Sequence, residues 1–298
     1  MEVVPYAGWS RNARLTSGDL ELIVTLEVGP RIMRFARTGG ANVLRNYEED
    51  LGKTGGNEYH SYGGHRLWIA PEEDPKTMTP DNEPVDSSEG DGWQKFSTRE
   101  EPWHVQKEIA VAAVEGGFKI RHRIYNRGVY AVQLAPWAIT VMEPGGTCAF
   151  PQSPFVPHSQ RLLPVRPIVL WGYTDMSDPR YTWGKQIVRL RHDSTGGNQK
   201  IGSLVEQGIA VYALRDQLFV KRFDFDPACS YPDMGCNFET FTRQDMLEIE
   251  SLGRLQMVQP KGYAEHCEAW YLLSNTQLPI ADDDCSRLLQ DLALKCPL

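Results

Sequence analysis

Carboxylates on strand-like segments are the residues of this chain best suited to proton transfer. Glu239 follows a Gly235–Cys236 turn within the stretch GCNFETF, and a second tight turn, Pro260–Tyr263, comes later. Extended backbone sends alternate side chains to opposite faces, so Asn237 and Glu239 share a face. A partly buried carboxylate beside an amide has a raised pKa and can act as a general base. We therefore predict that Glu239 is a base and that Asn237 helps to bind the substrate.

A second alternating segment offers a rival for the same role. In Met246–Ser251, Glu248 and Glu250 lie on the face opposite Leu247 and Ile249. Glu248 is therefore the alternative catalytic base.

A glycine turn with polar and aromatic neighbours lies much earlier in the chain, at His60–Trp68. Its glycines allow the backbone to come close to a ligand. His65, Arg66, Trp68 and, just beyond, Glu72 supply hydrogen-bonding groups and an aromatic plate, the mixture that a sugar requires. The structural alternative is an Arg66–Glu72 pair with Trp68 in the core. His60 and His65 do not have the His-x-His spacing of a cupin metal site, so we expect no metal.

Four other side chains are candidates for the same site. Trp137 and Trp171 offer flat faces for stacking against a sugar ring. Lys221 offers a cation for a phosphorylated sugar, and His158 in the loop sequence PFVPHS is a candidate acid, with an ordinary surface histidine as the alternative.

The elements that must position these residues are predicted to be mostly strands. Short apolar or alternating runs are separated by glycine-rich turns at intervals of about 8–12 residues, which indicates an all-β sandwich or barrel. The expected strands are 20–26, 109–113, 118–125, 131–141, 168–173, 187–190, 209–213, 218–223, 246–251, 255–259 and 268–273. One helix is expected at 282–294, and the polar segment 71–92 is expected to be either a disordered surface loop or a long loop over the site. We expect one domain over residues 1–298.

Composition excludes some classes of function. The net charge of −8 argues against nucleic-acid binding, which needs a basic face. No apolar run is long enough to span a membrane, and the N-terminus lacks a secretory signal, so a cytoplasmic location is expected. The six cysteines are scattered and are expected to be mostly free thiols.

The order of the carboxylate strand, the later turn and the closing strand segment EAWYL resembles the C-terminal part of the aldose 1-epimerase, or galactose mutarotase-like, superfamily. The resemblance implies a β-supersandwich of antiparallel sheets, a cleft for a sugar or oligosaccharide, and a glutamate base, which would be Glu239 or Glu248. The chain departs from the family at its central strand, which reads LAPW where the family has an Asn-His pair. The family often has a second histidine after its central strand, and His158 lies in a comparable loop. The resemblance therefore implies that His158 could replace the missing histidine as the acid.

The leading hypothesis is a cofactor-free, metal-free sugar epimerase or mutarotase-like enzyme. The lost central histidine leaves open a carbohydrate-binding protein without catalysis. A glycan hydrolase or lyase on the same fold is the third possibility, because paired glutamates also suit that chemistry.

Overall fold

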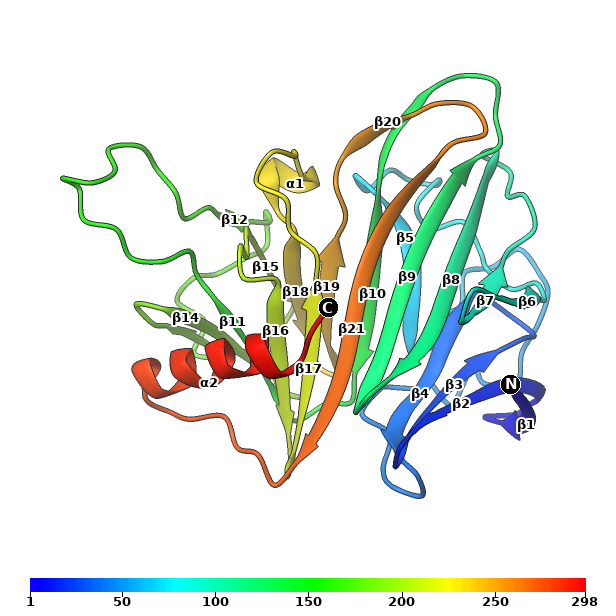
Figure 1. Ribbon diagram of the computed structural model, residues 1–298, viewed down its shortest axis with the longest axis horizontal. Coiled ribbons are helices and arrows are strands. Elements are labelled where there is room, and N and C mark those ends of the chain that lie inside the picture. Colours follow the sequence, from blue (N-terminus) through cyan, green and yellow to red (C-terminus); the bar gives the residue numbers. More distant parts are fainter.

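Two large antiparallel β-sheets form the computed structural model, which describes residues 1–298 (Figure 1). The first sheet has 11 strands. In spatial order they are β1 (Glu2–Tyr6), β2 (Trp9–Ser17), β3 (Leu20–Thr25), β4 (Arg31–Arg37), β5 (His65–Ala70), β10 (Val132–Met142), β19 (Met246–Leu252), β18 (Phe238–Arg243), β15 (Gln199–Ser203) and β12 (Ile168–Leu170), with β20 (Gln256–Val258) paired to β10.

The second sheet has 10 strands and lies against the first. In spatial order they are β13 (Tyr181–Trp183), β14 (Ile187–Arg191), β11 (Thr147–Pro151), β16 (Ile209–Leu214), β17 (Gln217–Phe223), β21 (Tyr263–Ser274), β9 (Gly117–Asn126), β8 (Val105–Val114), β7 (Trp93–Ser97) and β6 (Asp86–Gly90). The expected all-β class is confirmed.

Alternation along the strands explains the layering. In β9, Phe118, Ile120 and Ile124 are buried, whereas Lys119, Arg121 and Arg123 are half-buried on the other face. The apolar faces of the two sheets meet in one core of 41 residues. At its centre the Phe35 ring lies 5.8 Å from Phe219 and 5.7 Å from Trp270.

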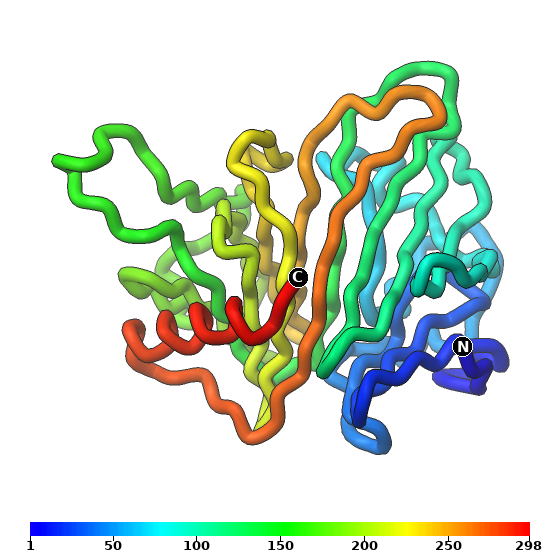
Figure 2. Tube along the Cα trace, viewed as in Figure 1, coloured from blue at the N-terminus to red at the C-terminus, as the bar shows by residue number.

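Two short elements interrupt the β architecture. α1 (Pro232–Gly235) is a single turn in which Asp233 and Met234 have positive φ. α2 (Asp282–Lys295) begins with three aspartates, which suit the positive end of a helix dipole. It crosses the outer face of the second sheet (Figures 1 and 2). There Leu289 and Leu292 pack against apolar side chains of β14, β16 and β17.

The polar segment 71–92 takes two courses. Its end forms β6 and the turn into β7, whereas its beginning runs beside the cavity described below, to which Glu72 and Met78 contribute. Neither helix has the length and apolar character needed to span a bilayer.

Candidate functional site

The candidate site lies on the face of the first sheet that points away from the core. Strands β5, β10, β19, β18 and β15 are neighbours there, so their outward side chains form one surface. In register, Trp137 lies opposite Trp68, and Glu250 lies opposite both Ile139 and Glu239. Residues from four distant parts of the sequence are thereby brought together.

A cavity of about 240 Å³ opens on this surface. Its lining combines aromatic rings with ionised groups. The lining residues are Tyr47, Tyr59, Ser61, Arg66, Trp68, Glu72, Met78, Trp137, Ile139, Val141, Tyr173, Lys200, Phe241, Arg243, Met246 and Glu248. This size, slightly below the range of drug-sized ligand sites, suits a small ligand.

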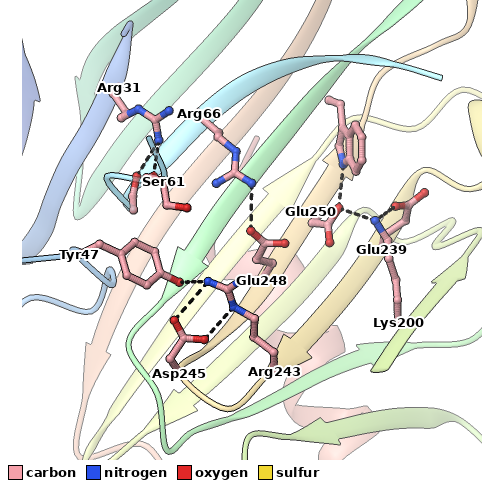
Figure 3. Close-up of polar contacts among 12 residues, drawn as sticks. Arg31, Tyr47, Ser61, Arg66, Lys200, Glu239, Arg243, Asp245, Glu248 and Glu250 are labelled. Carbon is pink, nitrogen blue, oxygen red and sulfur yellow. Dashed lines mark hydrogen bonds and ion pairs between the residues drawn. The ribbon is translucent and has the colours of Figure 1, made fainter. Parts of the chain in front are cut away.

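An arginine–glutamate pair forms one wall of the cavity. Arg66 Nη2 donates to Glu248 Oε1 at 3.1 Å (Figure 3). The Arg66 guanidinium lies 4.4 Å from the centre of the Trp68 ring. Burial raises the pKa of Glu248 despite the opposing charge of Arg66. The other carboxylate oxygen, Oε2, has no protein partner and is not enclosed, so it is available to a ligand. A raised pKa makes this carboxylate a stronger base than an ordinary glutamate.

A lysine between two buried glutamates forms the second charged group. Lys200 Nζ lies 2.8 Å from Glu239 Oε2 and 3.1 Å from Glu250 Oε2 (Figure 3). Glu250 also accepts from Trp137 Nε1 at 2.8 Å. Burial alone would lower the pKa of Lys200. The negative charges of Glu250 and Glu239 outweigh this effect, so the pKa of Lys200 is raised. Burial raises the pKa of Glu239 well above its ordinary value, and Lys200 only partly offsets this.

The rim of the cavity is held by a second set of polar contacts. Arg243 pairs with Asp245 at 2.7 Å and donates to Tyr47 Oη at 3.3 Å. Burial raises the pKa of Tyr47 to about 12, so its phenol stays protonated and can donate a hydrogen bond at neutral pH. On the opposite rim, Arg31 donates to the carbonyl of Ser61 at 3.0 Å and so holds the glycine turn in place (Figure 3).

The structure brings five of the predicted site residues to the cavity. They are Arg66, Trp68, Glu72, Trp137 and Glu248. Glu239 points to the same side of the sheet but is fully buried behind Lys200 and does not line the cavity. Trp171 does not line the cavity but lies behind Lys200, with the centre of its ring 4.7 Å from Lys200 Nζ.

Four predicted residues lie elsewhere. Asn237 is buried and holds the backbone of Val205, with Val205 N donating to Oδ1 at 2.7 Å, because it precedes β18 instead of lying within it. His158 is exposed in the loop between β11 and β12 and is not part of the cavity.

His65 and Lys221 point into the space between the sheets, on the side of the first sheet away from the cavity. His65 contacts Thr140 Oγ1 at 2.9 Å and His122 Nε2 at 2.7 Å, and burial lowers its pKa well below the ordinary value. Lys221 pairs with Glu268 at 2.8 Å. Strand alternation separates His65 from Arg66, its neighbour in sequence.

The buried interior contains one group with metal-ligand chemistry, His65, His122 and Glu268. The Lys221 ammonium already neutralises Glu268, and a divalent cation would have to displace it. His60, His65 and Glu72, the residues weighed as a cupin-like alternative, do not come together, because His60 contacts Asp50 at 2.9 Å and Glu72 lies on the opposite side of the sheet from His65.

Sequence reasoning missed Lys200, Arg243 and Tyr47 as site residues. Lys200 comes from a short, almost wholly buried strand, and only its pairing with β18 places it beside Glu239. Arg243 lies only five residues before Glu248, across the turn of the β18–β19 hairpin, whereas no local spacing connects Lys200 or Tyr47 to Glu248.

With this arrangement established, the class of fold is clear from solved structures. A candidate aldose 1-epimerase from Escherichia coli K12 matches with a TM-score of 0.60 at 10% identity, over 88% of this chain and 99% of that one. A galactose mutarotase-like protein from Lactobacillus casei matches with a TM-score of 0.57 at 8% identity, over 88% and 100%. The Slr1438 protein of Synechocystis matches with a TM-score of 0.59 at 12% identity, over 93% and 100%.

The chain therefore has the galactose mutarotase-like fold, and the expected structural resemblance is confirmed. It shares that fold with candidate aldose 1-epimerases and mutarotases. No protein-family profile matches the chain, and no curated protein matches it by sequence.

Proposed function

We propose that the protein interconverts the anomers of a small sugar, without a cofactor, in the cavity on the first sheet. The observation that carries the proposal is the Arg66–Glu248 pair beside Trp68, with one carboxylate oxygen free and a second cation, Lys200, lining the same cavity. Sugar rings present an apolar face to Trp68 and Trp137, and their hydroxyls suit the ionised groups between these rings.

The proposed reaction uses Glu248 as the base. Its free oxygen takes the proton from the anomeric hydroxyl, the C1–O5 bond breaks, and O5 receives a proton from water while the Lys200 ammonium stabilises the charge that develops on O5. The carbonyl carbon then rotates about C1–C2, and the reverse proton transfers close the ring as the other anomer. Arg66 fixes the carboxylate throughout. Acid–base placement of this kind contributes about 10²–10⁴-fold in rate.

A second candidate is a protein that binds a sugar and does not turn it over. It is favoured by one observation: none of the residues that line the cavity is a histidine. The fold and the aromatic walls suit binding equally well in either case.

Anomer exchange measured by NMR, over a panel of aldoses and sugar phosphates, tests the proposal. Glu248→Gln keeps the side-chain shape and should lower catalysed exchange by about 10²-fold or more. Glu239→Gln should have a smaller effect, since that carboxyl lies behind Lys200. Glu265→Gln is the control, because Glu265 pairs with Arg123 on the other sheet.

Four outcomes separate the hypotheses. Exchange lost in the Glu248 variant with sugar binding retained supports the enzyme. Sugar binding without exchange in the wild type supports the binding protein. Exchange lost in the Glu239 variant and kept in the Glu248 variant would return the role of base to Glu239. Absence of sugar binding by the wild type would overturn both candidates.

A further inference from the structure

A second cavity, of about 500 Å³, lies on the outer face of the 10-stranded sheet, beside the segment that leads into α2. It shares no residue with the cavity described above. Val188 and Leu190 of β14 face the core, so Arg189 and Arg191 between and after them face outward into this cavity. Arg180 and Arg215 complete a set of four arginines around it.

The charges in this cavity are not balanced by protein groups. Arg180 pairs with Asp178 at 2.8 Å, and Arg191 pairs with Asp193 at 3.2 Å. Arg189 has no carboxylate within ion-pair distance, and neither has Arg215. No Asp or Glu is among the lining residues, although the whole chain carries a net charge of −8. Two guanidinium charges are therefore left without a counter-ion.

Arg189 is the anomalous member of the set. It is only 9% exposed, and its one hydrogen bond within the protein runs from Nη2 to the carbonyl of Pro279 at 2.9 Å. Arginines this buried are almost always paired with a carboxylate, because a desolvated charge without a partner is costly. Its other two nitrogens, Nε and Nη1, are not sealed inside the protein, so they are accessible to a ligand in the cavity.

We propose that this cavity binds the phosphate group of a small phosphorylated molecule. A phosphate ester carries a charge of about −1.5 to −2 at pH 7, which matches the two uncompensated arginines. Guanidinium groups bind such oxyanions through paired, charge-assisted hydrogen bonds. The hydroxyls of Thr147 and Thr182, which also line the cavity, can donate to the remaining oxygens. The volume lies within the range of small-molecule sites and leaves room beyond the phosphate itself.

Binding is tested by calorimetry and thermal unfolding with inorganic phosphate, pyrophosphate, glycerol phosphate and malonate, each at the same total ionic strength set with chloride. Constant ionic strength removes general screening from the comparison. Inorganic phosphate and glycerol phosphate should raise the melting temperature above the chloride baseline. Glycerol phosphate binding more tightly than inorganic phosphate indicates an ester, and the reverse order indicates the free ion. Malonate binding more tightly than either would overturn the assignment to phosphate.

Two variants locate the site. Arg189→Met and Arg215→Gln should each weaken phosphate binding by at least about tenfold, the loss expected for one charge-assisted contact. Arg127→Gln, which changes an exposed arginine of the β9–β10 loop, should leave binding unchanged. Arg189→Met should also be no less stable than wild type in phosphate-free buffer, since it removes an unpaired buried charge. Full phosphate binding by both variants, or no response of the wild type beyond chloride, would overturn the proposal.

Discussion

Replacement of Lys200 by methionine tests the electrostatics of the candidate site. The change removes the cation that lies 2.8 Å from Glu239 and 3.1 Å from Glu250, and leaves both carboxyls buried. Removal of one partner from a buried ion pair costs about 3–5 kcal/mol, because the remaining charge has no compensation. We expect Lys200→Met to lower the free energy of unfolding by that amount at pH 8.

The size of the loss should depend on pH. The pKa of Glu239 is raised in the folded protein, since burial outweighs Lys200. Between the unfolded and the folded pKa, the folded state holds one more proton, so stability falls as pH rises through this window. Without Lys200 the folded pKa rises further and the window extends upward. Within this window the free energy of unfolding of the variant should fall by about 1.4 kcal/mol more per pH unit for each additional proton bound. Near pH 5 the stability of the variant should approach that of the wild type.

Urea unfolding at intervals between pH 5 and pH 8 measures this effect. Lys119→Met is the matched control, because Lys119 is half-buried on β9 and forms no ion pair. In the double variant Lys200→Met/Glu239→Gln, part of the stability and most of the added pH dependence should be restored. The reasoning would be refuted if Lys200→Met lowered the free energy of unfolding by less than about 1 kcal/mol, with a pH profile parallel to that of the wild type.

Two further predictions concern the scaffold. Gly63→Ala should destabilise the protein by more than about 1 kcal/mol in urea unfolding, because Gly63 has a φ of 88° and an added Cβ would lie 2.1 Å from the Arg45 carbonyl oxygen. Gly39→Ala, with φ 74° and open space around it, should cost less, and equal losses would contradict the steric argument. Burial raises the pKa of Cys148 to about 12, so its thiol should not react with a disulfide reagent at pH 8 until urea unfolds the chain. Rapid labelling of Cys148 in the native protein, identified by mass spectrometry, would contradict its burial.

The fold was predictable because its long strands alternate. The segment 118–125 was expected as a strand with its cations on one face, and β9 shows this over Gly117–Asn126. The helix expected at 282–294 is α2, at Asp282–Lys295. Short strands were harder to recognise. All six residues of β5, His65–Ala70, are buried, so the segment has no exposed face and looks like a polar cluster instead of a strand.

The site was predictable only within single strands. Arg66 with Trp68, and Glu248 with Glu250, follow from the two-residue repeat of extended backbone. The repeat does not say which of two faces meets the core, and both faces of the first sheet carry polar groups. His65 was expected in the cavity for this reason, and it lies between the sheets. Lys200 could not be found at all, because the β15–β18 pairing that places it is long-range.

The buried network behind the cavity explains why polar residues occupy the core face. Lys221 Nζ donates to the carbonyls of Ala138 on β10 and Ile249 on β19, each at 3.0 Å. These are neighbouring strands, and the residues on their opposite face include Ile139 and Glu250, which are in register. An ammonium that holds two strand backbones from inside therefore fixes the spacing of the side chains that face the cavity. Lys221, expected to contact a substrate, instead acts on the site through the backbone, and its pairing with Glu268 keeps that buried charge compensated.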